Sequence, residues 1–356
     1  MTQNHKGPPR ERLRQLVRQG AGAVPLPLGG SLQPLAIQTM FPGLVLLLLA
    51  GIAGATNVTA PGGPVIFAGS VPVFYQGLNG SKCYRIPSII KTSRGTLLAF
   101  SENRVTDCGD NGPHHALVLR RSTDNGQTWG PMSTVVEGTT PCPGCPAAIS
   151  NPNPVEVTLP SGKKAVLMSY DTMNNPTTKR HGLDMLIWSH DDGLTWTDKA
   201  LLSFPPEKNL GGLIGPSVGI QASDGSIYFS VIDTAGSGHF LFFSKDYGKT
   251  WRASTPVPGL GECSIAFLVS PSDGRIIMNC RIGAGNRAQV IWSKDAVPGA
   301  ITHPAELNVD PGCQGSIINQ GGTLYTSNAN STHSRSHMAI KISKDQVSER
   351  CGCPHE

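Results

Sequence analysis

Ser122-Thr-Asp-Asn-Gly-Gln-Thr-Trp129, Ser189-His-Asp-Asp-Gly-Leu-Thr-Trp196 and Ser244-Lys-Asp-Tyr-Gly-Lys-Thr-Trp251 share the pattern S-x-D-x-G-x-T-W. Shorter copies follow at Trp292-Ser-Lys-Asp295 and Ile342-Ser-Lys-Asp345. The starting serines stand at positions 122, 189, 244, 293 and 343, so the spacings are 67, 55, 49 and 50 residues. Regular units of about 50 residues predict a repeat architecture such as the blades of a β-propeller.

Each full copy has the chemistry of a tight turn between two strands. The Asp side chain can accept bonds from nearby backbone N–H groups, the Gly can adopt a positive φ, and the Trp can anchor the next strand in the core. Because a single active site has no need for three identical hairpins, we expect these carboxylates to be structural. An apolar strand is expected before each copy, at Ala116–Leu119, Met185–Trp188 and Phe240–Phe243.

The rest of the chain agrees with an all-β class. No segment between residues 64 and 345 reads as a long amphipathic helix, and short apolar runs lie between turns rich in Gly, Pro, Asn and Asp. Residues 64–356 are therefore expected to form one propeller domain. Further strands are expected at Thr96–Phe100, Lys164–Ser169, Ser226–Ile232, Ile276–Asn279 and Thr323–Tyr325.

The charge balance argues against a nucleic-acid-binding protein. The 356 residues contain 29 Lys and Arg against 24 Asp and Glu, a formal net charge of +5. Residues 1–39 contain five basic side chains and one acidic one, so the remainder has a net charge of only +1. A nearly neutral body lacks the basic surface that nucleic acids require.

The N-terminal region predicts export. Residues 41–55 contain an apolar run of about a dozen residues, which is the length of a signal-peptide core and shorter than the ~20 residues of a membrane-spanning helix. We expect residues 1–39 to be a basic leader that is disordered or untranslated, and residues 40–56 to be a signal peptide or an uncleaved membrane anchor. Sequons at Asn57, Asn79 and Asn330 agree with a secreted or lysosomal, lumenal protein.

Nine cysteines are compatible with an oxidising compartment but do not define a pairing. Cys142-Pro-Gly-Cys145 has the spacing of a redox or zinc pair. No second pair of this spacing accompanies it, so a local disulfide or free thiols are favoured over a metal site.

The repeated turn resembles the Asp box of the sialidase (neuraminidase) family, and a second motif makes the resemblance specific. Cys83-Tyr-Arg-Ile-Pro87 is similar to the Tyr-Arg-Ile-Pro motif of that family. The similarity follows the order of non-viral sialidases from about residue 70 to 345. It implies a six-bladed β-propeller and an exo-α-sialidase without cofactor or metal. The reaction implied is hydrolysis, with retention, of terminal sialic acid on glycoproteins, glycolipids or oligosaccharides.

The resemblance also implies a set of arginines that bind the carboxylate of sialic acid. Their positions match Arg85, Arg281 and Arg335, and such groups bind carboxylates through bidentate, charge-assisted bonds. Arg104 resembles a further arginine of the pocket, with an ordinary salt bridge as the alternative. A plain surface arginine is the alternative for Arg335.

The same resemblance assigns two carboxylates. Asp110 matches the general acid, ten residues before Arg120, and Asp107 is its competitor. Glu262 matches the base that assists a tyrosine nucleophile, which sialidases use in place of a second carboxylate. Exposed carboxylates without function are the alternative for each.

The chain departs from the family pattern near its end. Ser343-Lys-Asp345 begins an Asp box that no G-x-T-W completes, and no tyrosine follows Tyr325, whose position does not match the nucleophile. We therefore expect a propeller that is incomplete at the C-terminus, with its last blade truncated. Two other readings follow: a catalytically dead, lectin-like propeller that binds sialylated glycans, or a fragment that does not fold. Hydrolase and trans-sialidase activities are not distinguished.

Overall fold

The computed structural model describes residues 71–110, 114–138, 148–173, 184–201, 212–233, 238–283, 285–304 and 309–343. All of them belong to one unit, Gly43–Glu356, that is separate from Met1–Pro42. The expected leader, the apolar run, the Asn57 sequon, the Cys142–Cys145 pair and the box fragment at Asp345 lie outside these ranges, apart from the two strand residues that open that fragment.

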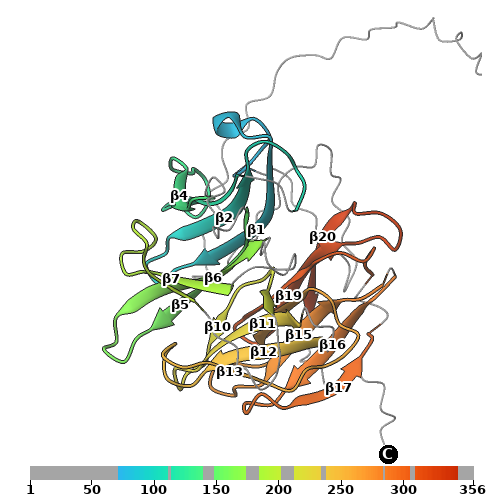
Figure 1. Cartoon of the computed structure of the whole chain (residues 1–356). Coiled ribbons are helices and arrows are strands. Elements are labelled where there is room, and N and C mark those ends of the chain that lie inside the picture. The colour runs from blue at the N-terminus through green and yellow to red at the C-terminus, as the bar shows by residue number, and fades with distance from the viewer. Residues whose placement is uncertain are drawn as a thin grey trace, which may run out of the picture. The chain divides into compact units, whose positions relative to one another are not determined.

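The described residues form antiparallel meanders (Figure 1), and the first two meanders share one sheet. A single parallel residue pair, His115 with Ala148, joins them. The first consists of β1 (Cys83–Lys91), β2 (Leu97–Arg104), β3 (His115–Ser122) and β4 (Ser133–Val136). The second consists of β5 (Ala148–Thr158), β6 (Lys164–Met173), β7 (Asp184–Ser189) and β8 (Thr197–Leu201).

Three further meanders form separate sheets. The third consists of β9 (Gly212–Ile214), β10 (Ile220–Gln221), β11 (Ile227–Asp233), β12 (Gly238–Ser244) and β13 (Arg252–Ala253). The fourth consists of β14 (Cys263–Phe267), β15 (Ile276–Arg281), β16 (Arg287–Trp292) and β17 (Pro298–Thr302). The fifth consists of β18 (Ser316–Gln320), β19 (Thr323–Ala329) and β20 (Met338–Ser343).

The all-β prediction is confirmed for the described residues. Each of the eight expected strand segments falls within an observed strand or overlaps one, and the 3₁₀ turn η1 (Leu78–Gly80) is the one helical element in these ranges. Five meanders are described. The expected number of six blades stays a prediction.

The first strands of neighbouring meanders lie side by side and run in the same direction. The Oγ of Ser217, which precedes β10, donates to the Oγ of Ser264 on β14 at 3.1 Å, and the same Ser264 Oγ accepts from the backbone N–H of Ile317 on β18 at 3.2 Å. Gly219 N donates to Pro154 O of β5 at 3.0 Å. The start of each first strand and the end of each second strand therefore lie at one end of the meanders, which we call the first-strand end.

The S-x-D-x-G-x-T-W turns lie at the opposite end, between β3 and β4, between β7 and β8, and between β12 and β13. In the first copy, Ser122 Oγ accepts from Gly126 N at 2.8 Å, and the Asp124 carboxylate accepts from the backbone N–H of Thr128 at 2.9 Å and from its hydroxyl. These bonds to Thr128 lower the pKa of Asp124 to about 2. The same bonds recur at Asp191 and Asp246, which confirms the structural role expected for these carboxylates.

The glycine and the tryptophan of the second turn pack against the first meander. Gly193 has a φ of +82°, which favours glycine, and an added Cβ would lie 3.1 Å from the Leu98 side chain, a tight contact. Trp196 meets Phe100 of β2 edge to face with ring centres 5.7 Å apart. Trp251 stacks on Phe242 of its own meander at 5.3 Å. The contacts of Gly193 with Leu98 and of Trp196 with Phe100 cross between meanders, so the second turn holds the first two meanders together as well as reversing the chain.

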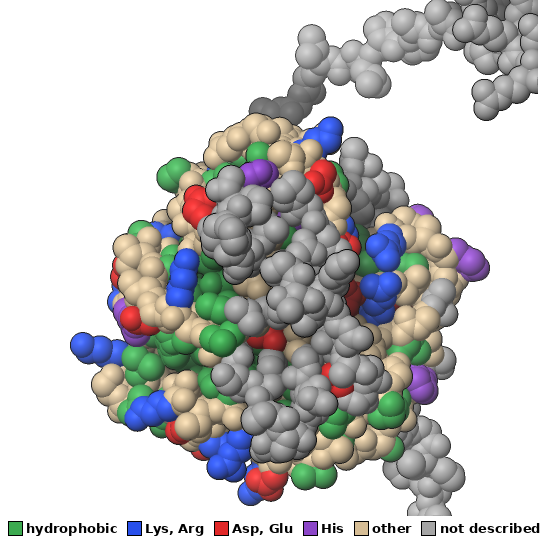
Figure 2. Space-filling view, viewed as in Figure 1, with side chains coloured by type: hydrophobic (Ala, Val, Ile, Leu, Met, Phe, Trp, Pro, Cys, Tyr) green, Lys and Arg blue, Asp and Glu red, His purple; other side chains and the backbone are tan. Residues whose placement is uncertain are grey.

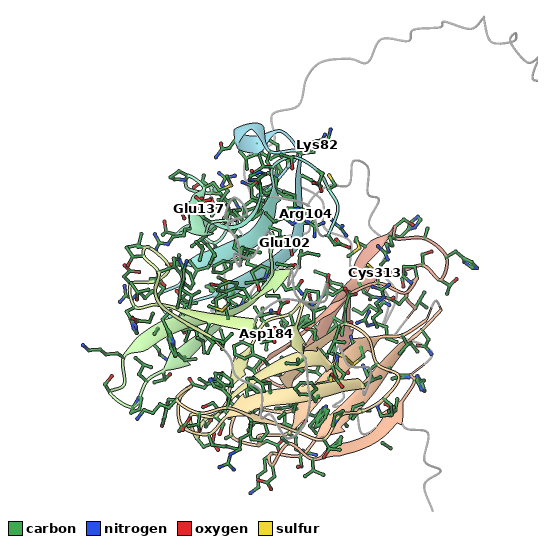
Figure 3. The ribbon with its side chains drawn as sticks, viewed as in Figure 1. Lys82, Glu102, Arg104, Glu137, Asp184 and Cys313 are labelled. Atoms are coloured by element: carbon green, nitrogen blue, oxygen red, sulfur yellow. A yellow bond between two sulfur atoms is a disulfide. The ribbon has the colours of Figure 1, made fainter. Side chains whose placement is uncertain are left out.

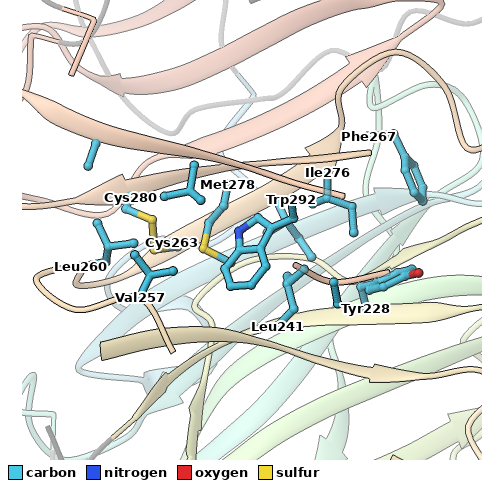
Figure 4. Close-up of a cluster of buried hydrophobic side chains, with 14 of the residues drawn as sticks. Tyr228, Leu241, Val257, Leu260, Cys263, Phe267, Ile276, Met278, Cys280 and Trp292 are labelled. Atoms are coloured by element: carbon cyan, nitrogen blue, oxygen red, sulfur yellow. A yellow bond between two sulfur atoms is a disulfide. The ribbon is translucent and has the colours of Figure 1, made fainter. Parts of the chain in front are cut away.

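A second part of the core lies between the third and fourth meanders. Figure 4 shows Trp292 between Met278 and Leu241, with the Cys263–Cys280 disulfide near one end of the cluster. Trp292 is fully buried, and burying a side chain of this size contributes roughly 3 kcal/mol from apolar area. This cluster supports the two strands, β14 and β15, that carry Glu262 and Arg281 at their ends.

On the face drawn in Figure 2, Lys and Arg side chains are spread over the surface and alternate with Asp and Glu. No continuous basic band crosses the described part of this face. Within the described ranges no helix is long and apolar enough to cross a membrane.

Candidate functional site

The pairing of β1 with β2 places four polar side chains on one face at the first-strand end. Cys83 is paired with Arg104, and Arg85 with Glu102. Paired residues share a face, and residues two apart on a strand share it too. Tyr84 points to the opposite face, where its hydroxyl donates to Leu78 O at 2.8 Å.

Arg104 and Glu102 form a buried ion pair next to each other on β2 (Figure 3). Their side chains are 1% and 0% exposed. Arg104 Nε lies 2.8 Å from Glu102 Oε2, and Nη2 contacts the same oxygen. The other oxygen, Oε1, accepts from Asn151 N at 2.9 Å and from the Ser150 hydroxyl. A buried pair of charges is stable only when its remaining polar atoms are satisfied, and here the second meander satisfies them.

Arg104 also organises the loop that follows β2. Its Nη1 donates to Cys108 O at 2.9 Å, to Gly109 O at 2.7 Å and to Asp110 Oδ1 at 2.8 Å. Arg85 Nη1 reaches the same Asp110 oxygen at 2.7 Å. Asp110 is 63% exposed, so two guanidinium groups hold a carboxylate that is also open to solvent.

The two arginines determine the charge of Asp110. Partial burial by itself would raise the pKa of its carboxyl, but the hydrogen bond from Arg104 and the charges of Arg85 and Arg104 outweigh burial and lower it. Asp110 is therefore ionised at neutral pH in this arrangement. Its competitor Asp107 does not reach these arginines among the described contacts; it accepts from Gly109 N at 2.8 Å and shapes the turn.

Glu262 and Arg281 form a second group at the first-strand end. Arg281 Nη1 lies 2.7 Å from Glu262 Oε2, and Arg281 N donates to Glu262 O at 2.8 Å. The two side chains are 27% and 36% exposed respectively, so solvent screens the pair and its contribution to stability is small. The Cys263–Cys280 disulfide joins the adjacent residues of β14 and β15.

Arg335 lies in the turn between β19 and β20, which is also at the first-strand end, and its side chain is exposed. It makes no hydrogen bond or ion pair with another residue of the described ranges. The structure thus brings Arg85, Arg104 and Asp110 into one contact group and Glu262 with Arg281 into another. Arg335 makes no contact with either group among the described residues. The functional roles of all six stay predictions.

A mostly apolar cavity of about 230 Å³ lies elsewhere, on the other face of β1. Its lining includes Tyr84, Pro87 and Ile89 of β1 and Ile317 of β18, and none of the six expected site residues. We assign the candidate site to the charged groups, because a carboxylate ligand requires cationic donors that this cavity lacks.

Glu102 is a site residue that motif matching did not identify. Its carboxylate accepts a hydrogen bond from Arg104 and so fixes that guanidinium. The sequence signal that could have identified it is its position two residues before Arg104, which places both side chains on one face of a strand. No cluster of three or more His, Cys, Asp or Glu side chains able to hold a metal ion occurs within the described ranges.

Comparison with known proteins agrees with the motifs. The model of the BNR repeat-like domain matches residues 95–350. A sialidase of Micromonospora viridifaciens is 30% identical over 337 residues, covering 84% of this chain and 51% of the relative. Human sialidase-4 is 28% identical over 286 residues, covering 66% of this chain and 54% of the relative. The chain thus spans about half the length of these curated relatives.

Solved structures point the same way. The structure of the Hadza microbial sialidase Hz136 superposes with a TM-score of 0.65 at 26% identity, covering 80% of this chain and 62% of the other. An intramolecular trans-sialidase of Ruminococcus gnavus superposes with a TM-score of 0.62 at 18% identity, covering 76% and 82% of the two chains, which supports the fold alone. With the Asp boxes and the family model, these similarities show that the chain belongs to the sialidase family with BNR (Asp-box) repeats.

Proposed function

We propose that this protein is an exo-α-sialidase with a six-bladed propeller, which hydrolyses terminal sialic acid from glycoproteins, glycolipids or oligosaccharides with retention. The observation that carries the proposal is the Asp110 carboxylate held by Arg85 and Arg104 at an exposed strand end. A carboxylate already bonded there indicates that the same guanidinium groups can bind the carboxylate of a ligand.

In the proposed mechanism the substrate takes over part of this arrangement. Arg85 is 38% exposed, so its guanidinium can turn from Asp110 to the substrate carboxylate. Once that charge neutralises Arg85, Asp110 loses an interaction that favours its ionised form, and the pKa of its carboxyl rises. A protonated Asp110 can then donate its proton to the departing glycosidic oxygen, a step that contributes typically 10²–10⁴-fold.

Glu262 is proposed as the base that activates a tyrosine nucleophile. Its bond to Arg281 orients the carboxylate while leaving it partly exposed. Arg281 and Arg335 are proposed to complete the carboxylate-binding set, which requires the β19–β20 turn to bring Arg335 inward when a ligand is bound.

A sialic-acid-binding, lectin-like protein is the second candidate. Two observations favour it: Tyr84 hydrogen-bonds on the face of β1 away from Arg85, and Tyr325 lies in the middle of β19, paired with Ile318 and Ile342. Neither tyrosine occupies a position beside Glu262 among the described contacts. Such a protein would bind sialylated glycans without cleaving them.

The proposal includes export. The apolar run at residues 40–56 would act as a signal peptide or anchor, which directs the propeller to the cell exterior or to the lysosomal lumen. Asn79 is exposed in the structure and could accept a glycan there. Deglycosylation of protein from a eukaryotic culture, followed by mass spectrometry, tests this part alone.

The direct experiment uses the full chain and the methylumbelliferyl α-ketoside of N-acetylneuraminic acid. Release of free sialic acid, with the α-anomer appearing first by NMR, supports the retaining sialidase, and a first-formed β-anomer contradicts retention. Asp110→Asn should lower kcat by about 10²–10⁴-fold. Glu137→Gln, an exposed residue of the same meander, is the matched control. Saturable binding of the ketoside without release would identify the lectin-like alternative instead.

A further inference from the structure

Two thiols lie beside the contact group of Arg85, Arg104 and Asp110. Neither thiol has a part in the proposed reaction. Cys83 is the first residue of β1 and is paired with Arg104 at the end of β2. Cys108 lies in the loop between β2 and β3, four residues after Arg104. Both are free cysteines in the structure.

The loop returns over the start of β1, which brings Cys108 close to Cys83. Arg104 Nη1 donates to Cys108 O at 2.9 Å, and Arg85 Nη1 donates to the same oxygen at 3.3 Å. Because Cys83, Arg85 and Arg104 share one face of the β1–β2 pair, these bonds place the Cys108 backbone on the face that carries the Cys83 thiol. Burial raises the pKa of the Cys83 thiol, and the Cys108 thiol is also near enough to contribute to this rise.

We propose that Cys83 and Cys108 form a disulfide in an oxidising compartment, and that this bond fixes the loop carrying Asp110 against β1. The bond itself requires nothing of the proposed sialidase activity. Its effect on catalysis rests on that proposal, because Asp110 stands two residues after Cys108.

The fourth meander offers a parallel within the same molecule. There the Cys263–Cys280 disulfide joins the first residue of β14 to the end of β15, and the residues beside it are Glu262 and Arg281. A Cys83–Cys108 bond would stand in the corresponding position of the first meander, at the start of the first strand and just beyond the end of the second. Each of the two contact groups would then be bordered by a disulfide.

The exposure of the thiols indicates the order of the chemistry. Cys108 is exposed and Cys83 is half-buried, so a small disulfide such as oxidised glutathione meets Cys108 first. Burial, and then the neighbouring Cys108 thiol, raise the pKa of the Cys83 thiol against the opposing charges of Arg104 and Arg85. Cys83 is thus the resolving residue rather than the first nucleophile.

The exchange balances in two steps. The Cys108 thiolate attacks one sulfur of oxidised glutathione, forms a mixed disulfide and releases one glutathione thiolate. Cys83 then loses its proton to water and attacks the Cys108 sulfur, which releases the second glutathione. Two protein thiols become one disulfide, and one molecule of oxidised glutathione is reduced to two thiols.

The first test is disulfide mapping of the full chain after equilibration with oxidised glutathione, alkylation of remaining thiols and digestion with trypsin. Cleavage after Lys82, Arg85, Arg104 and Arg120 separates the two cysteines, so the bond appears as Cys83–Arg85 linked to Val105–Arg120. Cys108→Ser should abolish the linked peptide and leave Cys83 alkylated. Cys313→Ser, which removes the other free thiol of the described ranges, should retain it.

The second test asks whether the disulfide fixes the loop against β1. It uses amide hydrogen exchange and thermal unfolding, without any sialoside. Oxidation should slow exchange of residues 105–110 by about tenfold and raise the Tm by about 5 °C, since the bond closes a loop of about 25 residues. Cys108→Ser, which replaces an exposed side chain by one of similar size, should show neither change. Alkylation of both cysteines after oxidation, or a link from Cys108 to Cys313, would overturn the proposed bond. A linked peptide with unchanged exchange at residues 105–110 would contradict the proposal that the disulfide fixes this loop.

Discussion

Arg104 Nη1 lies 2.8 Å from Asp110 Oδ1, and the same guanidinium is bonded through its other nitrogens to the buried Glu102. The buried carboxylate of Glu102 thus fixes Arg104, and Arg104 in turn holds the mostly exposed carboxylate of Asp110. This relationship connects the core of the first meander to the loop at its surface.

Replacing Glu102 by Gln should lower both stability and ligand binding. The change leaves the buried guanidinium of Arg104 without its counter-charge, and breaking one side of a buried ion pair costs about 3 kcal/mol or more. Thermal unfolding of the full chain should show a Tm lower by at least ~5 °C. Glu137→Gln, an exposed residue that follows β4, should leave the Tm unchanged. Equal Tm values for Glu102→Gln and wild type would refute this role of the buried pair.

Asp191→Ala should reduce stability without affecting the first-strand end. The substitution removes the acceptor for the backbone N–H and hydroxyl of Thr195, which lie at the opposite end of the second meander from Asn151. We expect a Tm lower by a few degrees and an intermediate value for Asp191→Asn, which keeps one acceptor oxygen. Sialoside affinity measured by calorimetry should match that of wild type. A loss of affinity at unchanged Tm would mean that the turn contributes to the site.

The repeated turns and the strands between them were predictable because both depend on residues that are close together in the sequence. The turn at Ser122 depends on side chains within eight consecutive residues, and its hydrogen bonds join residues two or four apart. Arg85 and Asp110 were identified by similarity to known motifs. Their contact required the register of β1 with β2 and the course of the following loop, neither of which a local pattern contains.

Other features of the site were beyond the sequence for the same reason. Glu102 is bonded to Asn151, 49 positions later, in a different meander. The closeness of Cys83 to Cys108 depends on the bonds that Arg104 makes to the loop backbone. The predicted grouping of Arg335 with the other arginines was not found as a contact, because its turn leaves the side chain exposed.

Asp171 and Asp184 form a buried carboxyl pair that should make stability depend on pH. Burial raises the pKa of Asp171 to about 6, although bonds from Asp184 and Asn151 oppose the shift. Burial, and then the bond to Asp171 and its charge, raise the pKa of Asp184 well above its usual range. Both pKa values lie above the unfolded value of about 3.9, so the folded state retains protons that the unfolded state loses. The stability of the folded state therefore falls as pH rises from about 4 through 6 and beyond.

Asp184→Asn should therefore stabilise the protein at neutral pH. The neutral amide removes the free-energy cost of ionising residue 184 in the folded state. It can still donate a hydrogen bond to the Asp171 carboxylate across the β6–β7 pair. The Tm should be several degrees above wild type at pH 7, with the gap closing towards pH 4. Asp224→Asn is the control, because Asp224 is exposed and the pKa of its carboxyl is lowered, so no gain is expected. A gap that does not change with pH would exclude titration of the pair as its cause.

The central claim is that Arg85 and its neighbours recognise a ligand carboxylate, and one calorimetric comparison tests it most directly. The ligands are 2-deoxy-N-acetylneuraminic acid, which has no glycosidic bond to cleave, and its methyl ester. We predict that the full chain binds the acid about 100-fold more tightly than the ester, since a charge-assisted bidentate contact contributes roughly 3 kcal/mol. Arg85→Lys should remove most of this preference, whereas Arg94→Lys, on the exposed turn after β1, should retain it. Equal affinity of the wild-type chain for the acid and the ester would contradict the account.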